Sequence, residues 1–204
     1  MPLVTFSPCF CTPMRVLALR LGGCLLSWLG ATVQAQPVPY LLDAAHTRVH
    51  WEVMHFGTST SRGRFDDVRG SLELDPASGT GEVSIEVRTT SVDTGVLPLD
   101  AVLRRDYLAS AAHPVAYFVA RGWRWQPDAP LEVRGEFTLR GVSLPLSLRA
   151  PLLRCVPHPE LQREVCGADL SGTLRRSDFG ITDGLPFIGD TVRLVVQVEA
   201  IRQR

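Results

Sequence analysis

The sequence predicts an all-β fold, an antiparallel barrel of about eight strands with one short amphipathic helix. Apolar and polar residues alternate with a period of two along most of residues 40–204, and turn-forming stretches such as Asp75–Gly79 separate the alternating segments. An apolar-faced sheet of this size either closes into a barrel or folds into two layers. A barrel is favoured over a sandwich because the sequence has no Cys-Trp-Cys signature of an immunoglobulin domain.

Residues 1–35 are typical of a signal peptide. Arg15 and Arg20 precede an apolar run from 21 to 33, which is too short for a membrane anchor, and cleavage is expected after Ala35. Translation is expected to start at either Met1 or Met14. Lipidation at Cys24 is a weaker alternative to cleavage after Ala35. The predicted mature chain is therefore one domain, residues 36–204, exported to the periplasm.

The charge balance excludes several function classes. The 21 basic residues equal the 21 acidic residues in number, and no block of like charge is present, which argues against nucleic-acid binding. All the basic residues are arginine, so a catalytic lysine and a phosphate-binding P-loop are impossible.

Alternation marks eight strands, and the segment 131–140 is the cleanest because its odd positions are apolar or glycine. Gly141 separates this segment from the next strand, as in a hairpin. The other strands are recognised from Val49–Val53, Leu72–Leu74, Val83–Val87, Val115–Arg121, Leu144–Ala150, Cys166–Leu174 and Val192–Val198.

One segment departs from this pattern. From Pro98 to Ser110, apolar residues recur every three to four positions, which predicts one amphipathic helix over an opening or edge of the sheet.

Cys155 and Cys166 are the two cysteines of the mature chain, and in an oxidising compartment they are expected to form a disulfide. Two separate buried thiols and a metal site are the alternatives.

Histidines and carboxylates gather near the first strand without the arrangement of a zinc site. On a strand, His46 and His50 share one face and His55 the other, so we expect no metal site and instead a polar clasp between Asp43 and His46. No catalytic residue is predicted, because Ser177 lies outside any G-x-S-x-G motif. Five charged residues are expected in surface or rim ion pairs: Asp66, Asp67, Arg175, Arg176 and Asp178.

Several motifs, in order along the mature chain, together resemble the YceI-like family of exported lipid-binding proteins. They are Tyr40–Thr47, Gly63–Phe65, Ser91–Gly95, Arg105–Asp106, His113–Pro114, Gly135–Gly141, Arg176–Ile181 and Gly189–Val192. The resemblance implies a lipocalin-like barrel of eight antiparallel strands. It also implies a ligand held in the bore, a polyisoprenoid or a related amphiphile such as a quinone or fatty-acid derivative.

Alternation and the family-matching positions together predict the wall of that bore. The ligand-binding residues expected are Trp51, Val53, His55, Phe65, Val83, Ile85, Val87, Phe118, Phe137, Leu139, Leu146 and Leu148. The expected function is non-enzymatic binding, transport or storage of the lipid, without a cofactor, by a monomer or homodimer that contacts membranes transiently. The alternative is a structural protein with a packed barrel, whose rim at Leu185–Ile188 captures a membrane or envelope partner.

Overall fold

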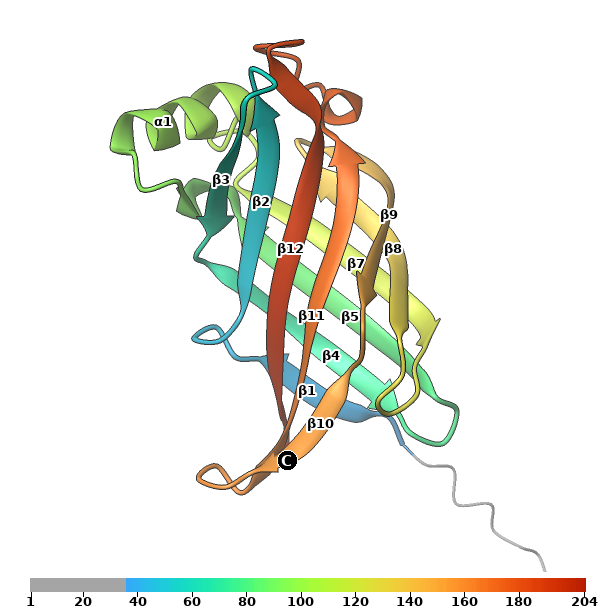
Figure 1. Cartoon of the computed structure of the whole chain (residues 1–204). Coiled ribbons are helices and arrows are strands. Elements are labelled where there is room, and N and C mark those ends of the chain that lie inside the picture. Colours follow the sequence, from blue (N-terminus) through green and yellow to red (C-terminus); the bar gives the residue numbers. More distant parts are fainter. Residues whose placement is uncertain (1–35) are drawn as a thin grey trace, which may run out of the picture. The chain divides into compact units, whose positions relative to one another are not determined.

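The computed structural model describes residues 36–204, which form an antiparallel barrel (Figure 1). The predicted signal peptide, the two start codons and Cys24 lie outside the described residues. The strands are β1 (Val38–Leu42), β2 (Arg48–His55), β3 (Ser59–Phe65), β4 (Val68–Asp75), β5 (Thr80–Arg88), β6 (Val92–Asp93), β7 (Val115–Arg124), β8 (Leu131–Leu139), β9 (Val142–Ala150), β10 (Arg154–His158), β11 (Arg163–Arg175) and β12 (Ile188–Arg202).

Eight of these strands form the closed ring. Their order is β11-β9-β8-β7-β5-β4-β1-β12, and β12 pairs back with β11 over eleven residue pairs. Closure satisfies the backbone groups that an open sheet edge would expose. The structure thus confirms the predicted barrel and excludes the two-layer sandwich.

β1 and β2 share one edge of β12. β1 pairs with Ala200–Arg202 and β2 with residues between Ile188 and Gln197. At one end of the barrel β1 also pairs with β4 and completes the ring, whereas at the other end the β2–β3 hairpin lies next to the helix (Figure 1). We call these the disulfide end, which carries β10, and the helical end, which carries α1.

All eight predicted strands are present, and four further strands were not predicted. β3 reads Ser-Thr-Ser-Arg-Gly-Arg-Phe, so it has almost no apolar residues from which alternation could be recognised. β1 and β10 are five residues long and each contains a proline, and β6 has only two residues. Short or polar strands are positioned here by pairing with their neighbours rather than by their own patterns.

The predicted helix exists with different bounds. α1 spans Leu97–Val102, with Pro98 in its first turn, and continues as a π-helical segment over Leu103–Tyr107. The Leu108 amide donates to the Leu103 carbonyl five residues earlier, at 2.8 Å, which is the π-type bond. No helix in residues 36–204 combines the length and hydrophobicity that crossing a bilayer requires.

The predicted disulfide is present. Cys155 on β10 and Cys166 on β11 are register partners, and their sulfur atoms lie 2.02 Å apart. The bond closes the β10–β11 hairpin and rules out both alternatives, separate thiols and a metal site at these two cysteines. It places a covalent link at the end of the barrel opposite α1 (Figure 1).

Candidate functional site

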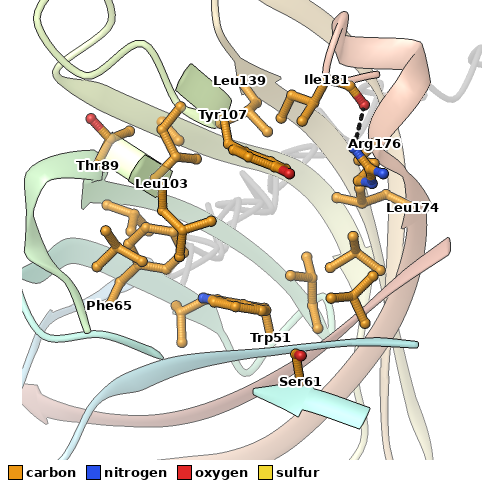
Figure 2. Close-up of a pocket in the computed structure, with 18 of the residues that line it drawn as sticks. Trp51, Ser61, Phe65, Thr89, Leu103, Tyr107, Leu139, Leu174, Arg176 and Ile181 are labelled. Carbon is orange, nitrogen blue, oxygen red and sulfur yellow. Dashed lines mark hydrogen bonds between the residues drawn. The ribbon is translucent and has the colours of Figure 1, made fainter. Parts of the chain in front are cut away.

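A cavity of about 220 Å³ occupies the helical end of the barrel (Figure 2). Its walls come from inward residues of the strands, including Trp51 of β2 and Leu139 of β8, and from Leu103 and Tyr107 of the helical segment. Nearly all of the lining is hydrocarbon or aromatic. Such a cavity favours an apolar ligand because few lining groups are able to hydrogen-bond with water.

A second cavity of about 50 Å³ lies in the same bore toward the disulfide end. The same strands line both cavities: β5 contributes Val87 to the first and Ile85 to the second, and β12 contributes Leu194 and Val196 respectively. Because inward positions recur every two residues, successive inward residues of one strand lie at successive depths. The bore is therefore hollow at the helical end and narrow at the depth of Ile85 and Val196. A third, more polar cavity of about 290 Å³ adjoins Cys155 and Glu164 at the disulfide end.

The structure distributes eleven of the twelve predicted wall residues between these two cavities. Seven line the larger cavity: Trp51, Val53, His55, Phe65, Val87, Phe137 and Leu139. Four line the smaller one: Val83, Ile85, Phe118 and Leu148. Leu146 is buried but lines neither cavity. As ligand contacts, all twelve remain predictions.

Two tryptophans shape the bore, each facing a glycine on the paired strand. A Cβ atom on Gly63 would clash with the ring of Trp51, and a Cβ atom on Gly81 would clash with the ring of Trp123. Any other residue at these glycines would push the indole away. Trp51 borders the larger cavity and Trp123 the smaller one.

Sequence reasoning missed the cavity residues outside the strands. Leu99, Leu103, Tyr107 and Leu108 line the larger cavity, as does Ile181 of the loop before β12. The three-to-four spacing after Pro98 marked the apolar face of the helix, so this signal was available for the first four. The loop residues carry no periodicity from which their orientation could be read.

The prediction that Arg176 makes a surface ion pair is wrong. Its side chain is only 4% exposed, lines the larger cavity and donates to three backbone carbonyls. Arg175, Asp66 and Asp67 do form exposed ion pairs. Within the described residues, Asp178 has no basic nitrogen within 4.0 Å.

The predicted Asp43–His46 clasp is present at the surface. His46 Nδ1 lies 2.7 Å from Asp43 Oδ2 and 3.9 Å from Glu199 Oε2. The hydrogen bond to Asp43 raises the pKa of His46, and the same bond lowers the pKa of Asp43. These three side chains hold ligand-type atoms within 4.8 Å of one another, and the ion pair accounts for that closeness.

Exposed apolar side chains surround the helical end. Phe187 is 61% exposed and stacks on Phe56, with ring centroids 5.5 Å apart, while Ile188 next to it points into the cavity. Leu97 at the start of α1 is 80% exposed. The Leu185–Ile188 run therefore contributes both to the rim and to the wall of the cavity.

Comparison with solved structures identifies the fold. The crystal structure of BcnA from Burkholderia cenocepacia aligns with a TM-score of 0.66 at 18% identity, covering 78% of this chain and 98% of BcnA. A polyisoprenoid binding domain from Saccharophagus degradans aligns with a TM-score of 0.62 at 17% identity, covering 81% of this chain and 99% of that domain. At these identities the likeness establishes the fold.

The sequence comparisons establish the family as well as the fold. Protein YceI of Salmonella arizonae is 30% identical over 188 residues, which cover 90% of this chain and 97% of that protein. The model of the YceI-like domain matches residues 40–200, nearly all of the described barrel. The chain therefore belongs to the YceI-like family.

Proposed function

We propose that the protein binds one long apolar amphiphile, a polyisoprenoid or a related quinone or acyl lipid, inside the barrel. The observation that carries this proposal is the apolar cavity at the helical end, walled by strands around the barrel and by the helical segment. Burying hydrocarbon there contributes about 0.8 kcal/mol per methylene, so a long chain is retained without any charged contact.

The comparisons support the same ligand class. The structurally similar domain from Saccharophagus degradans is described as polyisoprenoid binding, and this chain shares its fold. The proposed role is transport or storage rather than catalysis, and the only bound group it requires is the lipid itself. The disulfide is compatible with export, and we place the protein in the periplasm.

The rim offers a way for the lipid to enter and leave. Phe56, Phe187 and Leu97 expose apolar side chains and lie close in sequence to residues that line the larger cavity. An apolar rim beside a lipid-binding cavity fits transient contact with a membrane surface. We propose that lipid transfer takes place through the helical end of the barrel.

Organic extraction and mass spectrometry of protein purified from its native host would test the proposal. Native mass spectrometry of the intact protein gives the stoichiometry, and we expect one isoprenoid, quinone or acyl species per barrel. Repeated recovery of empty protein, with no uptake of offered lipids, would overturn the proposal. That outcome would favour the packed-barrel interaction protein instead.

A further inference from the structure

Arg176 is unusual among the residues that line the larger cavity. It follows β11 directly and opens a short 3-10 turn, Arg176–Phe179, which turns its side chain into the protein. It is the only arginine among the described residues that line this cavity, and it is 4% exposed. A buried guanidinium needs a physical reason, because leaving water is costly for a charged group.

Backbone carbonyls satisfy only part of its hydrogen-bonding capacity. Nε donates to Gly189 O at 2.8 Å, Nη1 to Ile181 O at 2.9 Å and Nη2 to Ile188 O at 2.9 Å. A guanidinium has five N–H groups, so two remain without a partner in the described part of the chain. These three bonds join Arg176 to Ile181 in the loop before β12 and to Ile188 and Gly189, the first two residues of β12.

No carboxylate balances the charge. Among residues 36–204, no Asp or Glu oxygen lies within 4.0 Å of Arg176, whereas its exposed neighbour Arg175 pairs with Asp190 at 2.9 Å. Carbonyl dipoles compensate a buried cation less completely than an opposite charge does. In the low dielectric of the cavity, an uncompensated cation attracts an anion more strongly than in water.

Tyr107 contributes a second polar group at the same place. Its ring centroid lies 5.8 Å from the Arg176 guanidinium carbon, and Figure 2 shows its hydroxyl directed toward the Arg176 side of the cavity. Within residues 36–204, no side chain or backbone group forms a hydrogen bond with this hydroxyl. One cation and one hydroxyl without a hydrogen bond thus lie at one point of a mostly apolar wall, whose other polar side chains are His55, Ser61 and Thr89.

We infer that the bound amphiphile carries an oxyanion headgroup, a carboxylate or a phosphate, which Arg176 binds and to which the Tyr107 hydroxyl donates. This inference rests on the proposed lipid-binding function and narrows it. The apolar chain lies along the rest of the wall, and the headgroup supplies the charge that the protein does not. A guanidinium suits both headgroups because its planar fork matches their oxygen atoms.

Matched ligands that differ only in the headgroup test this inference. Palmitic acid, hexadecyl phosphate and 1-hexadecanol have the same chain length, and quenching of tryptophan fluorescence reports binding because Trp51 borders the cavity. At pH 8 we expect at least one of the two anionic ligands to bind roughly 10- to 100-fold more tightly than the alcohol. Which one does so identifies the headgroup as a carboxylate or a phosphate.

Three variants separate headgroup binding from the role of Arg176 in holding the loop. Arg176→Gln should abolish the preference for the anion, so that the variant binds the anionic ligands no more tightly than it binds hexadecanol. Tyr107→Phe keeps the ring and should reduce the preference without affecting folding. Arg175→Gln removes a charge from the exposed neighbour and should leave the preference unchanged.

Each result bears on one proposal. Equal affinity for all three ligands in the wild type overturns the headgroup inference and leaves the lipid-binding function standing. Failure to bind any of them contradicts the lipid-binding function itself. Should Arg176→Gln not fold, the wild-type ranking and Tyr107→Phe decide the matter, and an unchanged preference in Tyr107→Phe contradicts the role of its hydroxyl.

Discussion

Two depths of the bore are lined by the same strands but are filled differently. At the helical end, residues such as Val87, Leu139 and Leu194 surround a cavity of about 220 Å³. Two residues further along the same strands, Ile85 and Val196 border a cavity of about 50 Å³. The difference shows that alternation determines which side chains face inward. The size of those side chains, and the residues packed against them, determine how much of the bore stays empty.

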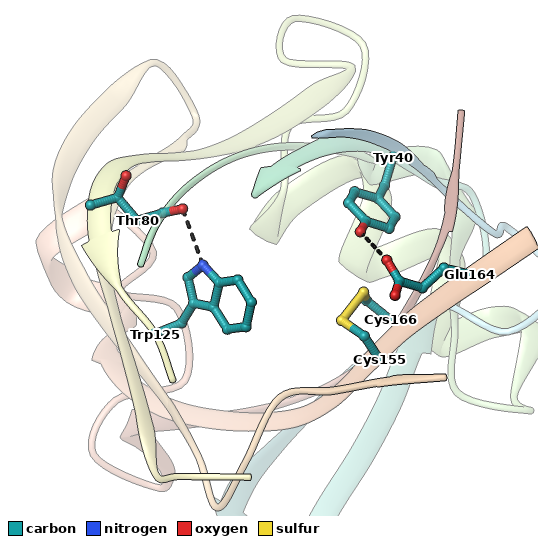
Figure 3. The surroundings of a disulfide bond; sticks show 6 residues. All are labelled: Tyr40, Thr80, Trp125, Cys155, Glu164 and Cys166. Carbon is teal, nitrogen blue, oxygen red and sulfur yellow. Dashed lines mark hydrogen bonds between the residues drawn. A yellow bond between two sulfur atoms is a disulfide. The ribbon is translucent and has the colours of Figure 1, made fainter. Parts of the chain in front are cut away.

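The disulfide end also carries a covalent link. Cys155 and Cys166 link β10 to β11, and the Tyr40 hydroxyl donates to Glu164 Oε1 at 2.5 Å (Figure 3). Burial, together with this hydrogen bond, raises the pKa of Tyr40. Trp125 Nε1 donates to the Thr80 carbonyl at 3.1 Å nearby. We infer that this end supplies stability while the helical end supplies binding.

The two tryptophans provide the strongest test of that division. Trp123→Ala should lower the free energy of unfolding by about 3–5 kcal/mol, since Trp123 is buried and its removal leaves a large cavity. Trp51→Ala, beside a space that is already hollow, should cost roughly 1–2 kcal/mol but weaken lipid binding clearly. Urea denaturation and native mass spectrometry of bound lipid measure the two effects. Equal stability losses would contradict the division.

Loss of the disulfide should act on stability alone. Replacing both Cys155 and Cys166 with serine removes a link between residues eleven positions apart, and should cost about 3 kcal/mol. Because the bond lies at the end away from the larger cavity, lipid affinity should stay within about twofold of the wild type. Denaturation curves and lipid titrations of the double variant check this. A parallel loss of lipid binding would mean that the two ends are coupled.

Two alanines of β7 give a finer comparison, because they lie on the same face of one strand. Ala120 is 2% exposed, and a Cβ on the facing Gly135 would lie 2.8 Å from its own Cβ. Ala120→Phe should therefore overpack the core and cost about 1–3 kcal/mol. Ala116 lines the larger cavity, so Ala116→Phe should fill it, cost little stability and weaken lipid binding at least about tenfold.

The same measurements check the alanine pair. Retention of normal lipid affinity by Ala116→Phe would show that the chain does not pass this part of β7. Ala116→Leu, with a smaller side chain, should weaken binding less than Ala116→Phe does. A graded response of this kind distinguishes filling of the cavity from a general disturbance of the strand.

Alternation in the sequence was sufficient for eight strands, because a period of two fixes one buried face. Seven of these strands belong to the closed ring, whereas β1, the eighth strand of the ring, was not predicted. Alternation did not predict how deep in the bore each inward side chain lies. Ile85 and Val87 follow the same alternation but border different cavities. The space left at each depth of the bore depends on contacts between residues far apart in sequence, such as the packing of the Trp123 ring against Gly81. Arg176 was misassigned because a charged residue next to another charged residue is usually exposed, and only the fold turns it inward.

The smallest expected effect concerns the surface clasp of Asp43 and His46, outside both cavities. The hydrogen bond to Asp43 raises the pKa of His46, so its contribution is fully present below about pH 6.5, the ordinary histidine value, and is lost as the pH rises through the raised pKa. The lowered pKa of Asp43 means that its contribution is present above about pH 3.9 and is lost as the pH falls through that lowered value. The clasp should therefore stabilise the protein most between about pH 4 and 6.5.

His46→Gln tests this window. The melting temperature of the wild type should exceed that of the variant slightly at pH 5.5, and the gap should close by pH 9. The gap is small because His46 is largely exposed, so solvent screens the pair. Lipid affinity should be equal in the two proteins at both pH values, because the clasp contacts neither cavity. A gap of the same size at pH 9 would assign the stabilisation to packing of the ring rather than to its charge.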